Sequence, residues 1–325
     1  MHKINIGVLG YANIAKKAII PAIQLSNCFT LYGVASRNED NKAEINQQLD
    51  CRFYDSYQSM VVDPEIDALY MPLPNSLHFE WASLALANGK HLLIEKSLAC
   101  TLDEVKILNQ LAEEKDLALL ENFQFTRHSQ LQIIKEILAS NKMGEIRAIK
   151  SSFGFPPFPD KNNIRYNKEL GGGSLLDAGA YPIKLAQELC GLDLNITAAV
   201  LNFENTEVDI WGAGMLQAKN SKNYMQFSFG FDNYYQCSLE VWGSKGKLFT
   251  NRIFTAPPGY KPRITIENSE GSKEMLLPPD NPFGKMLDYF YEATHNSDVK
   301  AKEYKANINQ ARLIKDFSNT AQINN

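Results

Sequence analysis

At roughly 150 residues per domain, a chain of 325 residues predicts about two domains and excludes a small fold that depends on disulfides. Hydrophobic residues make up 44% and charged residues 22%, which excludes long disorder, collagen and a coiled coil. A net charge of −4 without a dense basic run argues against a protein that works on nucleic acid or on an anionic membrane.

The cysteine spacing and the hydropathy of the chain indicate the compartment in which the protein works. The five cysteines are scattered and never paired as CxxC, so we expect neither a zinc knuckle nor a disulfide framework. No apolar run approaches the roughly 18 residues of a membrane helix. No basic and apolar leader precedes the strand-like run that begins at Ile4. These features predict a cytoplasmic protein with reduced thiols.

The first 122 residues alternate short β-rich runs with segments of helical spacing, which is typical of βαβ units and a parallel sheet. The predicted strands are Ile4–Leu9, Leu31–Ser36, Ala68–Pro72, His91–Glu95 and Ala118–Asn122. The predicted helices are Asn13–Ser26, Ser76–Asn88 and Asp103–Lys115, the last opened by a capping box at Thr101 and Glu104. Residues 1–122 are therefore predicted to form a doubly wound, Rossmann-type domain that binds NAD(P).

After residue 122 the pattern changes to a second α/β domain, residues 123–325. Helices are predicted at Gln130–Asn141 and Ser174–Leu189, and a strand at Ile146–Phe155. From Thr197 to Leu277 strands follow one another without helices, including a predicted hairpin of Tyr224–Phe231 with Gln236–Trp242. These strands predict a large, open and mostly antiparallel sheet. Helices close the chain near residues 282–294 and 304–321, and whether the last one packs back on the first domain stays open.

The turn after the first predicted strand reads Gly10-Tyr11-Ala12-Asn13-Ile14-Ala15. In the dinucleotide-binding fingerprint, three glycines make the tight turn, admit the pyrophosphate and allow close helix packing. Only Gly10 is a glycine here, with Ala12 and Ala15 at the other two places. The segment is either a dinucleotide loop or an ordinary βα turn, and its place after the first strand favours the loop.

The second predicted strand ends in Ser36-Arg37, where an NAD site commonly carries Asp or Glu for the ribose hydroxyls. A hydroxyl followed by a guanidinium suits a 2′-phosphate, because arginine binds phosphate through two parallel hydrogen bonds. The sequence therefore favours NADP(H) over NAD(H). The alternative is that Arg37 is a surface charge that opens a loop.

Glu95 and Lys96 arrive at the carboxyl end of a predicted parallel strand, where open α/β sheets bind ligands. A lysine there can stabilise negative charge on a substrate oxygen, and the alternative is a solvated ion pair. Pro72–His78 follows the third strand on the same side; His78 either contacts cofactor or substrate, caps a helix, or packs on Trp81. The other histidines show no ligand spacing, so we predict no metal.

Gly171–Gly173 precedes a helix that carries Asp177 and Tyr181 four residues apart, on one face. Tyrosine, with an ordinary pKa near 10, is a proton donor at neutral pH and suits protonation of the alkoxide formed when hydride reaches a ketone. The alternative for Tyr181 is a packed aromatic side chain.

Taken together and in this order, these motifs resemble the glucose–fructose oxidoreductase/inositol dehydrogenase (Gfo/Idh/MocA) family. The resemblance spans essentially the whole chain. Within the family the sequence looks most like the NDP-hexose (dTDP-sugar) 3-ketoreductase branch. The matching stretches are Ala12–Pro21, Tyr70–Asn75, Glu121–Phe125, His128–Gln130, Ile164–Tyr166 and Leu176–Pro182.

The resemblance implies an NAD(P)-dependent oxidoreductase that acts on CH–OH or C=O groups of a sugar or nucleotide-sugar, and a homodimer or homotetramer formed through the C-terminal sheet. It implies that Lys96 polarises the reacting carbonyl, that Tyr181 protonates it and that Asp177 holds substrate hydroxyls. The residues it implies for the cofactor are Gly10, Tyr11, Ala12, Asn13, Ile14, Ser36, Arg37, Pro72, Leu73, Asn75, His78, Glu95, Lys96, Asn122 and Arg165.

One departure from the family concerns Ser97, which follows Lys96 where the family usually has proline, often after a cis peptide bond. Either a cis bond is kept before a residue other than proline, or the lysine is presented differently. The first hypothesis is an NADPH-dependent reductase of a 3-keto nucleotide-deoxyhexose. A dehydrogenase of free sugars, inositols or trans-dihydrodiols is disfavoured by Tyr181 in place of His. A non-catalytic NADP-binding regulator is kept open by Ser97.

Overall fold

The computed structural model describes residues 3–324, which fall into two compact units. The first unit contains the described chain up to Asn122 together with Phe283–Ile308. The second contains Phe123–Pro282 and the residues from Asn309 onward. Residues 283–308 therefore belong to the first unit, whereas the sequence predicts them in the second domain.

Helix α8 (Pro282–His295) belongs to the first unit because its apolar side chains fill the core of that unit. Phe290 stacks on Phe29 of a central strand, with ring centroids 5.6 Å apart. Met286 and Leu287 are buried in the same cluster. Helix α9 (Ser297–Thr320) then begins in this unit, where Asn307 Nδ2 donates to Leu119 O at 3.0 Å. Closing helices thus complete a core that the first 122 residues leave unfinished.

The first unit is built on a parallel six-stranded sheet in the order β3-β2-β1-β4-β5-β6. Its strands are β1 (Ile4–Leu9), β2 (Phe29–Ala35), β3 (Arg52–Tyr54), β4 (Ala68–Met71), β5 (His91–Ile94) and β6 (Leu119–Glu121). Parallel strands covered on both faces read as continuous apolar runs, as β4 and β5 do. The strand order reverses between β1 and β4, which is the switch point where such sheets bind ligands.

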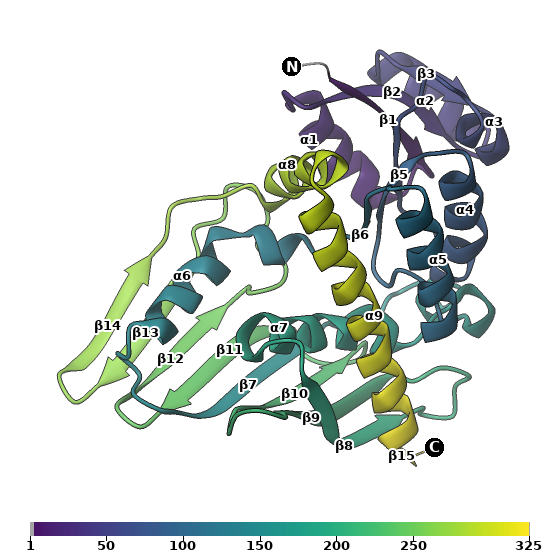
Figure 1. Ribbon diagram of the computed structural model, residues 1–325. Coiled ribbons are helices and arrows are strands. Elements are labelled where there is room, and N and C mark those ends of the chain that lie inside the picture. Colours follow the sequence, from purple (N-terminus) through teal and green to yellow (C-terminus); the bar gives the residue numbers. More distant parts are fainter. Residues whose placement is uncertain (1–2, 325) are drawn as a thin grey trace. The chain divides into compact units, whose positions relative to one another are not determined.

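Helices cover both faces of this sheet; α1 and α8 lie on one face, and α4 and α5 on the other (Figure 1). They are η1 (Ala15–Ile19), α1 (Ile20–Gln24), α2 (Asp40–Gln48), α3 (Tyr57–Val61), α4 (Asn75–Ala87) and α5 (Leu102–Glu114). The predicted capping box opens α5, since Thr101 Oγ1 accepts from Glu104 N–H and Glu104 Oε2 accepts from Thr101 N–H. The sequence did not predict β3 or the short helices α2 and α3 on either side of it.

The second unit is built on a mixed nine-stranded sheet in the order β14-β13-β12-β11-β7-β10-β9-β8-β15. Its strands are β7 (Ile146–Gly154), β8 (Leu194–Asn202), β9 (Trp211–Ala218), β10 (Tyr224–Gly230), β11 (Gln236–Gly243), β12 (Gly246–Asn251), β13 (Arg263–Asn268), β14 (Gly271–Leu276) and β15 (Gln322–Asn324). Only the β7–β10 and β8–β15 pairs among them are parallel, so the predicted open and mostly antiparallel sheet is confirmed.

The predicted hairpin of Tyr224–Phe231 with Gln236–Trp242 is wrong. Strand β7 lies between β10 and β11: Ile149 faces Met225 in the parallel pair and Val241 in the antiparallel pair. The two strands are close in sequence, yet each uses β7 as its partner. The hairpin prediction used only the residues of the two strands and the turn between them. Those residues cannot show that β7, which lies far upstream in the sequence, pairs with both strands.

One face of the second sheet is packed and the other is open. Helices α6 and α7 cover the packed face (Figure 1), where Met225, Phe227 and Phe229 are buried, while Gln226 and Ser228 between them are exposed. The helical segments are η2 (Gln124–Arg127), α6 (Ser129–Ala139), η3 (Ile164–Tyr166), η4 (Lys168–Leu170), η5 (Leu175–Gly179) and α7 (Ala180–Cys190). The part of α9 after Ile308 adds Leu313 and Phe317 to this core.

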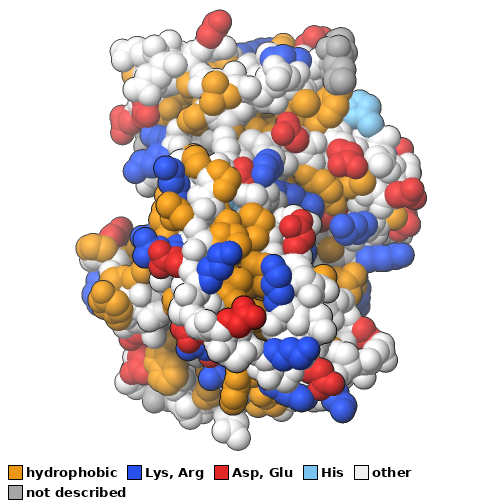
Figure 2. Space-filling model, turned by 90° about the vertical axis from the view of Figure 1, so that its left-hand side faces the viewer, with side chains coloured by type: hydrophobic (Ala, Val, Ile, Leu, Met, Phe, Trp, Pro, Cys, Tyr) orange, Lys and Arg blue, Asp and Glu red, His pale blue; other side chains and the backbone are white. Residues whose placement is uncertain are grey.

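Two properties of the described residues bear on membrane insertion and on metal binding. No helix within residues 3–324 combines the length and the apolar character needed to cross a bilayer. Within the same residues, His, Cys, Asp and Glu side chains form no group of three or more that could hold a metal ion. On the face drawn in Figure 2, basic and acidic side chains are interspersed, so that face carries no continuous basic surface for nucleic acid.

Candidate active site

The carboxyl ends of the parallel strands bring the predicted cofactor residues of the first unit to one edge of the sheet. Gly10 follows β1, Ser36 follows β2, Pro72 follows β4, Glu95 follows β5 and Asn122 follows β6. Parallel strands all end on the same side, so these five residues, far apart in sequence, line one edge. This is the edge at which open α/β sheets bind nucleotides.

The turn after β1 requires a glycine at its first place. Gly10 has φ +117°, and a Cβ on it would lie 2.8 Å from Cδ2 of Leu73. Its N–H donates to Ala35 O at 3.1 Å, which ties the turn to the end of β2. The next residues start the helix, with Lys16 N–H donating to Ala12 O at 3.0 Å. Asn13 and Ile14 are exposed at this helix start.

Tyr11 of this turn is fixed by a contact with α2, which the sequence did not predict. Its hydroxyl donates to Glu44 Oε1 at 3.2 Å, and Lys16 Nζ lies 2.7 Å from Glu44 Oε2 and 4.2 Å from the centre of the Tyr11 ring. Burial and the Glu44 carboxylate raise the pKa of Tyr11 to about 12. The phenol therefore stays protonated and fixes one wall of the turn. Glu44 had no motif that could have revealed it.

The segment after β2 presents a cation. Ser36 is buried, and its Oγ accepts from Asn38 N–H at 3.2 Å and Asn41 Nδ2 at 2.9 Å, so this hydroxyl shapes the loop. Arg37 is exposed, and its guanidinium carbon lies 5.2 Å from the centre of the Tyr57 ring. No ion pair involves Arg37 within the described part of the chain. An un-neutralised guanidinium stacked on an aromatic ring suits a phosphate.

His78 connects the backbone segments that follow β4 and β5. Its side chain is fully buried, with Nδ1 2.7 Å from Ser97 O and Nε2 2.9 Å from Leu73 O. Burial lowers its pKa to about 4. The ring joins two backbone segments and links the residues after β4 to those after β5. The direct contact with the cofactor that the resemblance implies for His78 stays a prediction.

Lys96 follows a half-buried glutamate whose side chain is fixed by two hydrogen bonds. Glu95 Oε1 accepts from Tyr70 Oη and from Asn122 Nδ2, both at 2.6 Å, and burial raises the Glu95 pKa. The Lys96–Ser97 peptide bond is cis, so the family's cis geometry is kept although serine replaces proline. Oδ1 of the buried Asn122 has no partner among the described residues.

Arg165 and Asp177 form an ion pair in the second unit. Arg165 Nε lies 2.6 Å from Asp177 Oδ2, and the guanidinium carbon lies 4.7 Å from the centre of the Phe158 ring. Asp177 stands in the π-helical turn η5, which leads into α7 one residue before Tyr181. The two residues predicted from separate motifs are thus brought together, and their opposite charges offset each other.

Tyr181 lies in an aromatic cage. Four phenylalanine rings surround it at centroid distances of 4.9–5.9 Å, and its side chain is only 8% exposed. These rings are Phe123, Phe125, Phe153 and Phe254. Close packing fixes the phenol in one orientation. Since Lys96 belongs to the first unit and Tyr181 to the second, their convergence on one substrate stays a prediction.

A parallel six-stranded sheet of this order, with a glycine turn after β1 and a lysine after β5, defines a nucleotide-binding α/β oxidoreductase. The comparisons with known proteins agree. Residues 4–123 match the oxidoreductase family with an NAD-binding Rossmann fold, and residues 131–249 match the GFO/IDH/MocA C-terminal domain. The chain belongs to the Gfo/Idh/MocA family of oxidoreductases, as its motifs predict.

The similar proteins include several sugar reductases. The dTDP-3,4-didehydro-2,6-dideoxy-alpha-D-glucose 3-reductase of Actinomadura kijaniata is 33% identical over 96% of this chain and 93% of its own length. A D-xylose 1-dehydrogenase (NADP(+)) of Haloferax volcanii is 26% identical over 97% of each chain. The crystal structure of KijD10, a 3-ketoreductase from Actinomadura kijaniata in complex with NADP and TDP-benzene, has a TM-score of 0.95 and 32% identity over 99% of both chains.

Proposed function

We propose that this protein is an NADPH-dependent reductase of the 3-keto group of a nucleotide-linked deoxyhexose. The observation that carries the proposal is similarity along nearly the entire chain to 3-reductases of dTDP-linked dideoxy sugars, at 33% identity over 96% of the chain. Lys96, Asp177 and Tyr181 supply the polar and proton-donating groups that such a reaction needs. We also propose a cytoplasmic location, where the five free cysteines stay reduced.

The first unit fits a phosphorylated dinucleotide. Gly10 keeps the turn after β1 open to backbone approach, and Arg37 provides a cation next to the end of β2. The two residues directly after β2, where an NAD site commonly carries Asp or Glu, are Ser36 and Arg37, and the first carboxylate, Glu39, comes two residues after Arg37. The KijD10 structures with NADP support the same choice. When bound, the reduced nicotinamide supplies the hydride.

The side chains of this protein supply charge stabilisation and the proton. The Lys96 ammonium donates a hydrogen bond to the substrate carbonyl oxygen and stabilises the negative charge that develops there. The Tyr181 phenol gives its proton to that oxygen, so the carbonyl becomes a hydroxyl by the gain of one hydride and one proton. Asp177, oriented by Arg165, accepts hydrogen bonds from neighbouring sugar hydroxyls. This mechanism requires Lys96 and Tyr181 to face the same substrate.

An assay over cofactors and sugars tests the proposal. NADPH and NADH oxidation is followed with a TDP-linked 3-keto deoxyhexose, with the same sugar lacking the nucleotide, and with free ketoses; NADP reduction is followed with xylose and inositol. We expect turnover with NADPH and the TDP-linked keto-sugar. Faster oxidation of free xylose or inositol would favour a sugar dehydrogenase, and tight NADPH binding without any turnover would favour a regulator.

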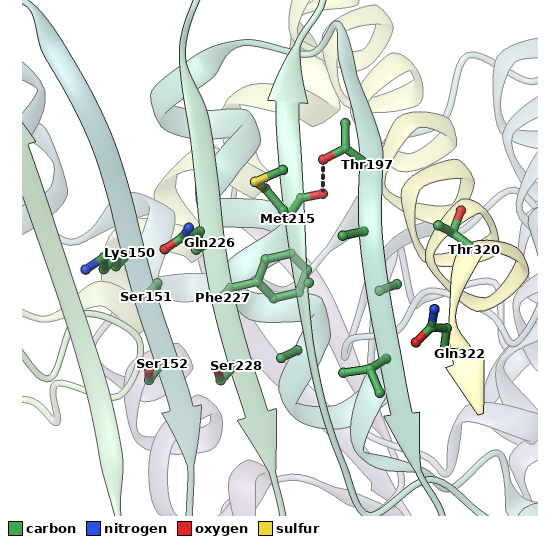
Figure 3. A pocket seen from close by; sticks show the side chains of 15 residues that line it. Lys150, Ser151, Ser152, Thr197, Met215, Gln226, Phe227, Ser228, Thr320 and Gln322 are labelled. Atoms are coloured by element: carbon green, nitrogen blue, oxygen red, sulfur yellow. Dashed lines mark hydrogen bonds between the residues drawn. The ribbon is translucent and has the colours of Figure 1, made fainter. Parts of the chain in front are cut away.

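We further propose that the open face of the second sheet pairs with a second copy of the chain. A hollow of about 730 Å³ crosses β7, β10, β9 and β8 on this face, with Gln322 of β15 at its rim (Figure 3). Small side chains such as Ser152, Ala213 and Ser228 line it. Trp242 of β11 and Phe249 of β12 are 58% and 37% exposed. Exposed apolar groups beside small residues on an open sheet face suit a self-complementary contact.

A further inference from the structure

Asp209 stands two residues before the start of β9, and its neighbour is tied to the second sheet. The next residue, Ile210, donates its N–H to Asn202 O at 2.8 Å and accepts from Phe231 N–H at 2.9 Å. These two bonds tie Ile210 to the ends of β8 and β10. Asp209 is therefore anchored, through Ile210, to the ends of two strands, and no sequence motif had singled it out.

Asp209 accepts hydrogen bonds from the donors at the start of the helical segment that carries Asp177. Oδ2 accepts from Ser174 Oγ at 2.7 Å and from Leu175 N–H at 2.6 Å, and the backbone oxygen of Asp209 accepts from Ser174 N–H at 2.8 Å. The first N–H groups of a helix have no partner within it. Here they find one on a distant segment, because no side chain at the helix start caps them.

The glycine triplet fits the space left by this contact. A Cβ on Gly173, which has φ +110°, would lie 2.5 Å from Asp209 Oδ1, and a Cβ on Gly172 would lie 2.5 Å from Arg165 O. Gly173 N–H also donates to Arg165 O at 2.9 Å. The turn thus passes between the Asp209 carboxylate and the Arg165 backbone with no room for side chains. Both partners of the Arg165–Asp177 ion pair are anchored to the same turn.

We propose that Asp209 is a positioning residue of the active site: its carboxylate sets the height and rotation of η5 and α7, and so the directions of Asp177 and Tyr181. This inference rests on the proposed function and assigns its geometry to a residue outside the reacting groups. The acceptor oxygens of Asp209, rather than its charge, do the positioning, since they meet neutral hydroxyl and amide donors. Burial raises the pKa of Asp209, which agrees with an environment that offers it no cation.

Three variants and one matched control test the proposal. Asp209→Ala removes the acceptors, Asp209→Asn keeps one acceptor oxygen without the charge, and Ser174→Ala removes one donor. Glu188→Ala is the control, because it breaks the 2.5 Å Lys135–Glu188 ion pair at the far end of the same helix. We expect Asp209→Ala to lower kcat for the keto-sugar about tenfold or more, as misplaced catalytic groups do, and to leave the NADPH Kd unchanged. Asp209→Asn should restore most of the loss, and the pH profile of kcat should shift only in Asp209→Ala.

Amide hydrogen exchange separates this inference from the proposed function. In Asp209→Ala, exchange of the amides of residues 174–181 should speed up, whereas in Glu188→Ala it should stay as in the unaltered protein. Unchanged exchange, or equal kcat losses in Asp209→Ala and Glu188→Ala, would overturn the positioning role. If Asp209→Ala does not fold, Asp209→Asn and Ser174→Ala decide by the same readouts. An inactive unaltered protein counts against the proposed function, and exchange then decides the role of Asp209.

Discussion

At the scale of single residues, the Tyr181 ring and the residue just before Lys96 are each fixed by neighbours of their own unit. Glu95, with its bonds from Tyr70 and Asn122, fixes the chain just before Lys96. The four-phenylalanine cage fixes Tyr181. A catalytic group whose orientation is set before substrate arrives loses little entropy in the reaction. The Tyr181 phenol should therefore act as a prepositioned group, and the Lys96 side chain should extend from a fixed backbone.

Replacing either group should abolish most turnover. We expect Lys96→Ala and Tyr181→Phe each to lower kcat about a hundredfold, the scale of general acid catalysis, while the Kd of NADPH, measured by fluorescence titration, stays unchanged. Lys219→Ala and Tyr224→Phe, a surface lysine and a half-buried tyrosine of the same unit as Tyr181, serve as controls. Full turnover in Lys96→Ala or Tyr181→Phe would rule out the assigned role.

Arg37 should decide between the two nicotinamide cofactors. A charge-assisted hydrogen bond contributes about 1.5–3 kcal/mol, so Arg37→Ala should weaken NADPH binding at least about tenfold and leave NADH binding nearly unchanged. Arg52→Ala is a matched control, because Arg52 also stacks on a tyrosine but pairs with Asp63. Equal losses for both cofactors in Arg37→Ala would contradict recognition of a 2′-phosphate.

His91 should make the fold sensitive to mild acid. Burial and the nearby Lys300 lower its pKa to about 4, while an unfolded histidine titrates near 6.5. As the pH falls from about 6.5 towards 4, the unfolded chain binds a proton that the folded chain refuses, so the free energy of unfolding decreases. Between pH 7 and pH 5 this loss is about 2 kcal/mol. Denaturant titrations of the unaltered protein and of His91→Gln should differ by this amount in their pH dependence; identical pH dependence would refute it.

At the scale of elements, the sequence pattern correctly predicted strands and helices that depend on their own residues. The apolar runs of β1, β4 and β5 and the capping box of α5 appear where the sequence places them. Helix α2 was missed because all of its residues except Ala43 and Ile45 are polar or charged, and only Ile45 is buried. The pairing of β10 and β11 was wrong because β7, from far upstream, supplies the partner of both.

The residues of the candidate site also fall into two groups, those that the sequence could predict and those that it could not. Gly10, the Glu95–Lys96 pair and the Asp177–Tyr181 pair stand in short motifs, so the sequence alone could single them out. Their supports come from remote segments that carry no motif, such as Glu44 beside Tyr11 and Asp209 beside Gly173. Reacting groups could thus be predicted, whereas the residues that orient them depend on tertiary contacts.

Two helix starts should respond differently to substitution. Gly173→Ala places a Cβ against Asp209 Oδ1 at a positive φ, and such strain costs about 1–3 kcal/mol. Thr101→Ala removes the cap of α5 at a cost of about 1 kcal/mol. Thermal unfolding should show both losses, but kcat should fall only in Gly173→Ala. A fully active Gly173→Ala would show that the turn before η5 does not set the geometry of the site.

At the scale of the whole molecule, the open sheet face predicts self-association. Sedimentation should show a dimer or tetramer rather than a 36.6 kDa monomer. Met215→Arg, in the hollow of the open face, should shift the protein to monomers because it brings like charges together across a symmetric contact. Leu25→Arg alters an 80% exposed apolar side chain of the first unit and should leave assembly intact. A monomeric unaltered protein would exclude the pairing.

The closing helices have a consequence for anyone who wishes to express the cofactor half by itself. The chain passes from one unit to the other after Asn122, after Pro282 and again after Ile308. A gene fragment that stops at Asn122 would lack α8, and the surface that normally receives Phe283, Met286, Leu287 and Phe290 would meet water. Such a truncation should aggregate. A soluble minimal version needs the 283–308 segment grafted back through a designed linker.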